Sequence, residues 1–372
     1  MVGGGHGAFI GEVHRIASRI DGHWDLVAGA LASGPDRARA SAADLGLAPD
    51  RSYGGFEEMA AAEAAREDGI DAVAIVTPNH MHAAPAVAFL RAGIHVICDK
   101  PLAATMEQAL VVADAARESG KRFILTHNYT GYPLIRQARE MVANGALGEL
   151  RVVNVEYVQD WLAGETSGKQ AEWRTDPERA GAGGCVGDIG THAFNLATYV
   201  TGLRAESLSA DLDAFVRGRR LDDNAHVMLR YAGGAKGMLW ASQVAVGNEN
   251  ALRLRVHGDK GGIDWSQESP NAMTFTPFGE PKRILTRAGA GATGAGLRNI
   301  RVPAGHPEGY LEGFATLYSE AAMLIRNADH GINLPEGAHT PGIGDGLEGM
   351  RFIAACVESS AKNAEWVRLQ ET

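Results

Sequence analysis

The strongest constraint on the fold is an alternation of apolar strand patterns with helical patterns over the first 125 residues. Ala72–Thr77 is a continuous apolar run with strand character, His95–Cys98 is a shorter one, and helical spacing follows each of them. Parallel strands need a crossover connection, which a helix usually supplies. The alternation therefore predicts an α/β fold, a doubly wound parallel sheet with helices on both faces.

The elements of this first region can be placed by their patterns. Helices are expected at Val13–Ile20, Pro35–Leu45, Phe56–Ala65, Ala84–Ala92 and Thr105–Ser119, and strands at Asp25–Leu31, Ala72–Thr77, His95–Cys98 and Phe123–Thr126. A glycine-rich turn begins at Gly3, so only Met1 and Val2 precede it. Since the first strand of such a sheet lies near its centre, we expect residues upstream of Met1 or another segment to complete it.

The pattern changes after residue 128, where strands follow one another with short turns. Strands are expected at Arg151–Gln159, His226–Tyr231, Lys236–Val244, Leu252–Gly258 and Gly262–Trp265, which indicates a largely antiparallel sheet. Helices are expected at Pro133–Asn144, near Asp188–Val200, and at about Gly309–Asn327 and Asp345–Asn363. The glycine-rich segment Arg287–Gly296 is expected to be a mobile surface loop.

A chain of 372 residues is too long for one core. We therefore predict two domains, residues 1–127 and residues 128–372, with the last helix (about 345–363) able to pack back on the first domain.

Composition and charge exclude several classes of function. The formal net charge of −10 argues against a nucleic-acid surface, which needs clustered Lys and Arg. Cys98, Cys185 and Cys356 are widely separated, which indicates neither disulfides nor a zinc pair and fits a reducing cytoplasm. No apolar run approaches the ~18 residues of a membrane span. His80 and His82 are two residues apart in a turn and no HExxH-type spacing occurs, so we predict no metal.

Three glycines near the start have part of the spacing of a phosphate-binding loop. Gly3 and Gly5 fit the first two positions of the G-x-G-x-x-G pattern, and the next fitting glycine is Gly11, after an expanded loop. Such glycines let the backbone approach a pyrophosphate while the following helix N-terminus faces its charge. A flexible tail is the alternative, and the strand–helix pattern that follows favours a dinucleotide.

The end of the second strand bears on the choice between NAD and NADP. An acidic side chain there normally binds the adenosine ribose hydroxyls. Ser33 follows the strand instead, and Arg37 lies one helical turn further on, so no carboxylate repels a 2′-phosphate and Arg37 can attract it. This tilts the preference towards NADP, although a solvated helix charge at Arg37 explains the pattern equally well.

Polar residues follow two further strands at the edge where parallel sheets bind ligands. Thr77–Asn79 ends one apolar strand, and Asp99 and Lys100 follow the next. Asn79 offers donor and acceptor groups to a ribose or carboxamide, and a partly buried Lys can exchange protons near neutrality. A Pro-Asn turn capped by His82 and an ordinary surface lysine are the structural alternatives.

A second constellation lies beyond residue 180. Asp188 and His192 are four residues apart, so on a helix they project from one face, where the carboxylate can orient the histidine as a general base. Gly183 and Gly184 just before them would let a substrate or nicotinamide approach closely. An N-capping Asp followed by a helix-face His is the common structural alternative.

Six motifs, in order along nearly the whole chain, resemble the glucose-fructose oxidoreductase, inositol dehydrogenase and rhizopine-catabolism (Gfo/Idh/MocA) family. They are the glycine-rich start, Thr77-Pro78-Asn79 with His82, Ala92–Pro101, Asn128-Tyr129 with Gly145–Gly148, Trp173-Arg174, and Asp188–His192. The resemblance implies a Rossmann domain followed by an α/β domain whose open sheet often forms the oligomer interface, hence a homodimer or homotetramer.

The resemblance also implies residue roles, with Lys100, Asp188 and His192 at the family's catalytic positions. Together with the patterns above, it predicts as cofactor-binding residues Gly3, Gly5, Gly11, Ser33, Arg37, Thr77, Pro78, Asn79, His82, Asp99, Lys100, Asn128, Trp173 and Arg174. The predicted substrate-binding residues are Lys100, Tyr129, Asp188, His192, Asn195 and His306.

Asp99 and Asn195 depart from the family pattern, and His306 has a structural explanation. Asp99 replaces the family's more usual Glu and is expected still to face the cofactor. Asn195 stands three residues after His192, where the family often has an Asp that touches substrate, so a close mimic of inositol dehydrogenase is not expected. A helix start flanked by proline explains His306 as well as a pocket does.

By resemblance, the chain is expected to be an NAD(P)-dependent dehydrogenase or reductase acting on CH–OH groups of a sugar, sugar derivative or cyclitol. His192, oriented by Asp188, would take the hydroxyl proton, and Lys100 would stabilise the alkoxide-like oxygen, with the final base left open between His192 and Lys100. Two alternatives remain: NAD-dependent glycoside cleavage by transient oxidation, and a catalytically silent dinucleotide-binding regulator.

Overall fold

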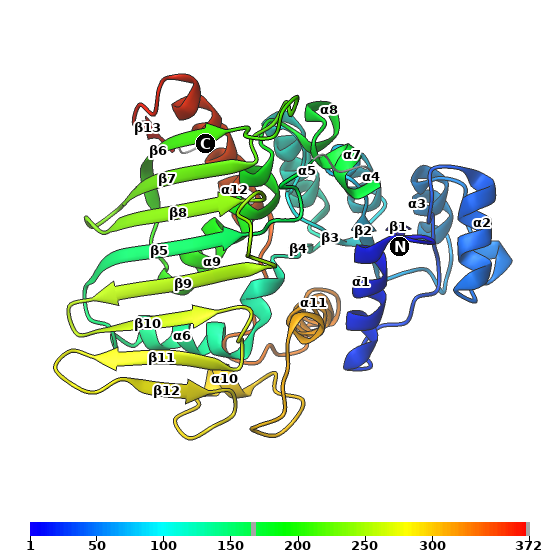
Figure 1. Ribbon diagram of the computed structural model, residues 1–372. Helices are drawn as coiled ribbons and strands as arrows, with labels where there is room; N and C mark the ends of the chain where they lie inside the picture. The colour runs from blue at the N-terminus through cyan, green and yellow to red at the C-terminus, as the bar shows by residue number, and fades with distance from the viewer. Residues whose placement is uncertain (165–168, 370–372) are drawn as a thin grey trace. The chain divides into compact units, whose positions relative to one another are not determined.

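A computed structural model describes residues 1–164 and 169–369 of the chain (Figure 1). The chain divides into two units, which we call unit 1 (Met1–Asn128 and Leu311–Leu347) and unit 2 (Tyr129–Tyr310 and Glu348–Thr372). We predict from the sequence that residues 128–372 form the second domain. In the structure, Leu311–Leu347 belongs to unit 1.

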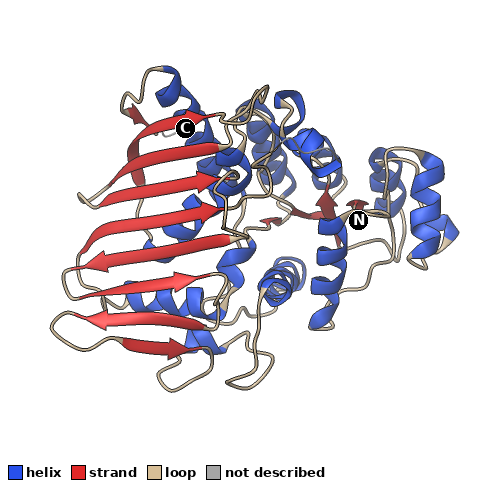
Figure 2. Cartoon of the chain, in the orientation of Figure 1, coloured by secondary structure: helices blue, strands red, loops and turns tan. Residues whose placement is uncertain are grey.

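Unit 1 contains a parallel sheet, as the alternating pattern predicted (Figure 2). Its strands lie in the order β1-β2-β3-β4, with bounds β1 Val2–Gly3, β2 Ala72–Val76, β3 His95–Cys98 and β4 Phe123–Leu125. Val73, Ile75 and Val96 have no exposed surface. The continuous burial of β3 and β4 is typical of strands covered on both faces and explains their apolar runs.

Helices and helical turns make up most of the rest of unit 1. They are α1 Phe9–Ile20, α2 Pro35–Asp44, η1 Pro49–Arg51, α3 Phe56–Ala64, η2 Asn79–Met81, α4 Ala83–Arg91, α5 Met106–Ser119, nearly all of α11 (Tyr310–His330) and the start of α12 (Ile343–Ala361).

The strand predicted at Asp25–Leu31 does not form as a continuous element. Only two isolated parallel bridges occur, between Val2 and Ala30 and between Gly29 and Ser52. The segment is nevertheless hydrogen-bonded on both sides, since Gly29 N–H donates to Arg51 and Ala30 accepts from the glycine-rich turn. Its neighbours are a two-residue strand and Ser52, which directly follows the helical turn η1, so no ladder long enough for a strand is available.

Unit 2 is built on a large, mainly antiparallel sheet, which confirms the predicted α/β architecture. The strand order is β12-β11-β10-β9-β5-β8-β7-β6-β13, and β5 with β8 is a parallel pair. The bounds are β5 Leu150–Val158, β6 Ala205–Asp213, β7 Asn224–Tyr231, β8 Lys236–Ser242, β9 Ala251–Gly258, β10 Gly261–Ser266, β11 Ala272–Pro277, β12 Arg283–Thr286 and β13 Val367–Arg368.

Side chains alternate along β7, where Val227 and Leu229 are buried while Met228 and Arg230 are exposed. α9 (Thr191–Thr201) packs against β5, β8 and β9, and its Phe194 stacks on Phe352 of α12 with ring centroids 4.4 Å apart. The sheet therefore has one face covered by helices and one open face, as expected for half-buried antiparallel strands. The other helical segments of unit 2 are η3 Asn128–Gly131, α6 Pro133–Ala143, α7 Lys169–Arg174, α8 Pro177–Ala180, η4 Val186–Gly190 and α10 Gly294–Leu297.

The segment Arg287–Gly296, which we predict to be a mobile surface loop, makes polar contacts at both ends. Arg287 is buried and donates to Asn271 and Glu308 at 2.8 and 2.9 Å, and the segment ends in α10. Glu140 of α6 accepts from the backbone of Ala295 at 3.0 Å. A glycine-rich composition is therefore compatible with specific polar contacts at both ends of the segment.

Candidate active site in two parts

The glycine-rich segment of unit 1 forms a tight turn between β1 and α1. The N–H groups of Gly3 and Gly5 donate to the carbonyls of Ala30 and Leu31 at 2.9 and 3.0 Å. A Cβ on Gly11 would lie 2.4 Å from a backbone Cα of the turn, so the first turn of α1 packs directly on it. Within the described residues no side chain caps the start of α1, which leaves its first N–H groups available to an anion.

The two residues that bear on cofactor choice are joined to each other. Arg37 donates from Nη2 to the hydroxyl of Ser33 at 3.2 Å, and both side chains are exposed. The carboxylate nearest in sequence, Asp36, pairs with Arg39 at 2.8 Å. Arg37 and Ser33 therefore lie side by side at the surface, shortly after the segment Asp25–Leu31.

His82 connects the two loops that follow β2 and β3. Its Nδ1 lies 2.7 Å from the carbonyl oxygen of Pro101, and its Nε2 lies 2.9 Å from that of Thr77. Only 1% of the residue is exposed, and burial lowers the pKa of His82. The predicted role of His82 in lining the cofactor stays a prediction, and in the structure its ring nitrogens lie against a backbone carbonyl of each loop.

The same loops carry the other predicted residues of unit 1. Asn79 is buried in η2, directly after Pro78. The backbone N–H of Asp99 donates to Ile75 at 2.9 Å, and the Asp99 carboxylate accepts from the hydroxyl of Thr126 at 2.9 Å. Lys100 follows Asp99 and is half-buried.

Asn128 lies at the end of unit 1, shortly after β4, and is 1% exposed. Its side-chain nitrogen has no hydrogen-bond partner among the described residues. A buried amide donor without a protein partner is costly, so this group is suited to a ligand or water.

Asp188 lies in unit 2, in the π-helical turn η4 that leads into α9. One of its carboxylate oxygens, Oδ2, accepts from Arg174 Nε at 3.1 Å and from Gln243 Nε2 at 2.9 Å. Two donors on one oxygen favour the ionised carboxylate. The alternative of an N-capping Asp does not hold, because these donors are side chains and not helix N–H groups.

Asp222 is the residue that caps this helical stretch. Its carboxylate accepts from the backbone of Gly184 at 2.6 Å and of Val186 at 2.8 Å, and burial raises its pKa. A Cβ on Gly184 would lie 2.1 Å from the Asp222 carbonyl, and one on Gly183 would lie 2.7 Å from the Val186 side chain. The expectation that these two glycines make room for a ligand is therefore wrong, since protein atoms occupy the space.

Arg174 and Trp173 lie together on α7. The guanidinium carbon of Arg174 is 4.3 Å from the ring centre of Trp173 and 5.9 Å from that of Trp161. Stacking on indole rings restricts a guanidinium in addition to its ion pair. The structure thus places Arg174, which we expected to line the cofactor, on the carboxylate of Asp188.

His192 lies on α9 among tyrosines and is 8% exposed. The ring of Tyr129 meets it edge-on with centroids 5.0 Å apart, and that of Tyr157 is 6.1 Å away. The two tyrosine hydroxyls lie 2.5 Å apart, and burial raises the pKa of both tyrosines. Both phenols are therefore neutral hydrogen-bonding groups at ordinary pH.

Of the remaining predicted substrate residues, one is buried and one is exposed. Asn195, one turn after His192 on α9, is 7% exposed, and its Oδ1 has no hydrogen-bond partner among the described residues. The side chain of His306 is exposed. Tyr310, four residues after His306, lies near the tyrosines, with its ring centroid 6.5 Å from that of Tyr129.

Sequence reasoning missed Gln243 and Tyr157. Gln243 is 55 residues from Asp188, directly after β8, and Tyr157 looks like one more buried position of an alternating strand. Gln243 did carry one general signal, since a polar residue that ends an apolar strand often lies in a site.

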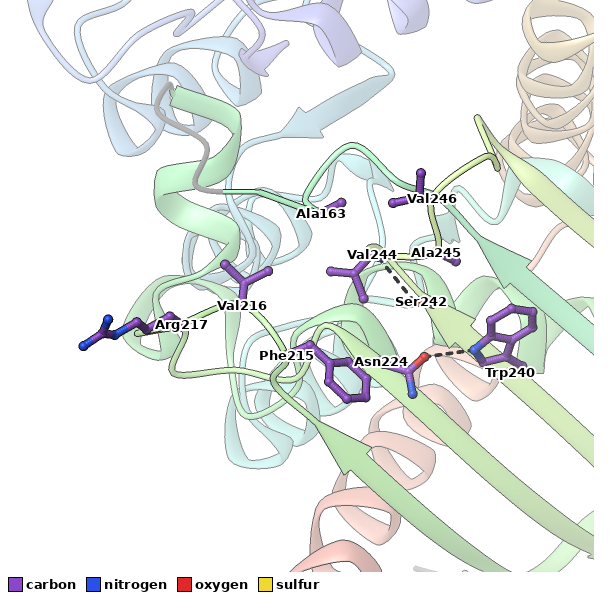
Figure 3. A pocket seen from close by; sticks show the side chains of 10 residues that line it. All are labelled: Ala163, Phe215, Val216, Arg217, Asn224, Trp240, Ser242, Val244, Ala245 and Val246. Atoms are coloured by element: carbon purple, nitrogen blue, oxygen red, sulfur yellow. Dashed lines mark hydrogen bonds between the residues drawn. The ribbon is translucent and has the colours of Figure 1, made fainter.

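A separate hollow of about 510 Å³ opens in unit 2 beside β7 and β8 (Figure 3). Phe215 and Val246 lie on its walls, and Trp240 donates from its indole nitrogen to Asn224 at 2.9 Å. None of the predicted site residues lines this hollow.

Two further properties concern the described residues as a set. No group of three or more His, Cys, Asp or Glu side chains in residues 1–164 and 169–369 is arranged to hold a metal ion. Among the helices of these residues, none is both long and apolar enough to cross a membrane.

Comparison with family models decides the identity of the fold. Residues 1–127 match the model of the oxidoreductase family with an NAD-binding Rossmann fold, and residues 135–264 match a GFO/IDH/MocA C-terminal domain. The chain belongs to the Gfo/Idh/MocA family. It is accordingly an oxidoreductase, as predicted, and its N-terminal region carries the NAD-binding fold of that family.

Similar proteins agree with this assignment. An oxidoreductase from Sinorhizobium meliloti is 55% identical, with 99% of this chain and 98% of that one covered and a TM-score of 0.89. An inositol dehydrogenase homologue from Azotobacter vinelandii, complexed with NADH and myo-inositol, is 35% identical over 99% and 96% of the two chains, with a TM-score of 0.92. Levoglucosan dehydrogenase of Pseudarthrobacter phenanthrenivorans is 29% identical, with 80% of each chain covered.

The residues of unit 1 fit the dinucleotide of Gfo/Idh/MocA proteins. The turn before α1 leaves open space at Gly7, since a Cβ added there would have no neighbouring atom within 4 Å. The N-terminus of α1 provides N–H groups, and the buried amide of Asn128 provides a donor. This combination is the donor set that a dinucleotide requires.

Proposed function

We propose that this chain is an NAD(P)-dependent dehydrogenase that moves hydride between nicotinamide and a ring hydroxyl or ketone of a sugar, sugar derivative or cyclitol. One observation carries the proposal. The carboxylate of Asp188 is oriented by Arg174 and Gln243, one helical turn before a buried histidine, His192. The relatives named for inositol and levoglucosan support a polyhydroxylated ring as substrate.

In this proposal His192 takes the proton of the substrate hydroxyl, and Asp188 stabilises the imidazolium that forms. Lys100 donates a hydrogen bond to the same oxygen and stabilises its developing negative charge. Tyr129 and Asn195 contact other hydroxyls of the ring. The bound nicotinamide supplies the hydride acceptor.

For the cofactor, the proposal assigns the pyrophosphate to the turn at Gly3, Gly5 and Gly11. The adenosine ribose belongs near Ser33 and Arg37. Because the guanidinium of Arg37 is positioned by Ser33 and its nearest carboxylate is engaged elsewhere, we propose that the chain accepts NADP as well as NAD, with a lean to NADP.

The test is a panel of sugars and cyclitols, including myo-inositol and levoglucosan, incubated with NAD⁺ or NADP⁺ and followed at 340 nm (the absorbance of reduced nicotinamide). The proposal predicts net reduced cofactor with at least one ring polyol. Release of an aglycone from a glycoside without reduced cofactor would indicate the glycosidase alternative. No reaction in spite of cofactor binding would indicate a regulator.

We also propose a homodimer or homotetramer, with a second copy covering the open face of the large sheet. Met228 and Met238 are cross-strand neighbours there and are 51% and 58% exposed. Light scattering after size exclusion checks this, and a monomer at micromolar concentration would contradict it.

A further inference from the structure

A series of side-chain hydrogen bonds in unit 2 runs from the surface to Tyr157 and Tyr129, the two tyrosines beside His192. Trp161 Nε1 donates to Gln159 Oε1 at 3.0 Å, and Gln159 Nε2 donates to Asn250 Oδ1 at 2.6 Å. The hydroxyl of Tyr157 lies 2.9 Å from the same Asn250 oxygen and 2.5 Å from the hydroxyl of Tyr129.

Trp161 sets the direction of every donor in this series. An indole N–H can only donate, so the atom of Gln159 that faces it is the amide oxygen and the amide nitrogen faces Asn250. The atom of Asn250 that meets this nitrogen must then be its oxygen. The reverse orientation would bring two amide nitrogens to 2.6 Å, with their hydrogens directed at each other.

The same argument gives the direction of the hydrogen bond between the two tyrosines. A phenol has one hydrogen, and that of Tyr157 is committed to the oxygen of Asn250. The hydrogen between the two phenols therefore belongs to Tyr129, and Tyr157 accepts it. Since burial raises the pKa of both groups, neither loses its proton in the neutral range. The oxygen of Tyr129 can therefore act towards any further partner only as an acceptor.

We infer that Tyr129 is a specificity-determining residue that demands a hydrogen-bond donor, a hydroxyl, on the ring carbon next to the reacting one. This inference rests on the proposed function. The ring of Tyr129 packs edge-on against that of His192, with centroids 5.0 Å apart. The proposal therefore places the reacting hydroxyl of a ring substrate at His192 and the substituent of the neighbouring carbon at Tyr129. The substrate class is thus narrowed to vicinal polyols, and a fluoro, keto or O-methyl substituent at the neighbouring carbon is rejected.

The test compares the best substrate of the sugar and cyclitol panel with its monodeoxy-monofluoro analogues. Fluorine resembles a hydroxyl in size but donates no hydrogen. The wild-type enzyme is expected to lose roughly 10- to 100-fold in kcat/KM for the analogue with fluorine beside the reacting carbon. Tyr129→Phe removes the acceptor and should reduce that ratio by at least about threefold. The part of the ratio that remains is the electron-withdrawing effect of fluorine on hydride loss, which both proteins share.

Tyr157→Phe is the sharper variant, because it frees the hydrogen of Tyr129 to point at the substrate. This variant keeps the Tyr129 oxygen in place. It should lower the ratio of kcat/KM for the hydroxyl substrate to kcat/KM for the fluoro analogue. Tyr231→Phe is the matched control. Tyr231 is another buried tyrosine of unit 2, and its hydroxyl has no hydrogen-bond partner among the described residues. This control should leave the ratio unchanged.

Two results would overturn the inference. The first is a wild-type ratio near unity at every fluorinated position. The second is an equal ratio in Tyr129→Phe and Tyr231→Phe, because a structural role lowers turnover of both substrates alike. Absence of reduced cofactor with every panel member contradicts the proposed function itself, and the inference with it. Turnover without discrimination overturns the inference alone.

Discussion

The loops at the carboxyl edge of the unit 1 sheet and the helix that carries Asp188 and His192 in unit 2 are held in place by different means. In unit 1 the loops are fixed mainly by backbone groups, as when His82 bridges two carbonyls and the N–H of Asp99 donates to Ile75. In unit 2 the positioning groups are side chains from separate elements. The first part thus depends mainly on the path of the backbone, with His82 as a connecting side chain, whereas the second depends on several side chains from different elements.

This difference has a functional consequence. A buried network of side chains depends on every member, because an unsatisfied polar group in a low-dielectric environment is costly. Arg174 and Gln243 on Asp188, and Tyr157 on Tyr129, are such members. We therefore expect substitutions in unit 2 to change turnover and substrate choice. In unit 1 we expect Lys100 to affect turnover and the other positions to affect stability and cofactor choice.

The largest effect is expected from His192→Ala. Loss of the general base should lower kcat by ~10²–10⁴-fold while cofactor affinity is retained. The matched control is His226→Ala, since His226 is an exposed histidine of β7 in the same unit. A decrease in kcat of less than threefold, with cofactor binding intact, would contradict the assignment of His192 as the general base.

A second prediction concerns stability and belongs to unit 1. His14 of α1 is completely buried, and desolvation lowers its pKa from 6.5 to about 4. Between these two values the unfolded state binds more protons than the folded state, so stability is present above pH 6.5 and is lost as the pH falls. The free energy of unfolding should fall by about 2 kcal/mol between pH 7.5 and 5 through His14 alone.

Urea unfolding at these two pH values checks the prediction. The variant His14→Gln should show a weaker pH dependence than the wild type. An equal dependence in both proteins would show that His14 is not the titrating group.

A smaller effect is expected from Gln243→Leu. Asp188 then keeps Arg174 as a side-chain donor but loses Gln243. We expect kcat to fall by about 10-fold, because loss of a hydrogen bond to a charged group amounts to ~1.5 kcal/mol or more. The acid limb of the pH profile should also move to higher pH, since a donor that favours the charged form is removed. A fall in kcat without any movement of the limb would contradict a positioning role.

The smallest effect is expected from Arg37→Ala in unit 1. Arg37 is exposed, so its contribution to binding a 2′-phosphate is screened by solvent. KM for NADP⁺ should rise by about 3- to 10-fold and KM for NAD⁺ should stay the same. An equal change for both cofactors would show that Arg37 does not contact the 2′ position.

The same contrast explains what could be predicted from the sequence. The parallel sheet of unit 1 was predictable because each strand is a continuous apolar run followed by its own helix, and the loop residues adjoin the strands. The failure at Asp25–Leu31 came from its neighbours, which are too short to form a ladder.

In unit 2 the sequence was less informative. The strands β6, β11, β12 and β13 were not predicted, and β12 and β13 are short edge strands with exposed residues. Gly183 and Gly184 were interpreted as ligand space, although contacts with Asp222 and Val186 explain them. Partners as distant as Gln243 and Asp188 are joined only by the tertiary fold, and nothing local in a single sequence encodes that contact.

The central claim, that the chain oxidises a ring carbinol by hydride transfer, is tested most directly by isotope tracing. The best panel substrate is deuterated at its reacting carbon and incubated with the oxidised cofactor, and the mass of the reduced cofactor is measured. The account predicts reduced cofactor that is heavier by a single deuterium in the wild type and only a trace of it in His192→Ala. Reduced cofactor of unchanged mass, or equal yields from both proteins, would contradict the account.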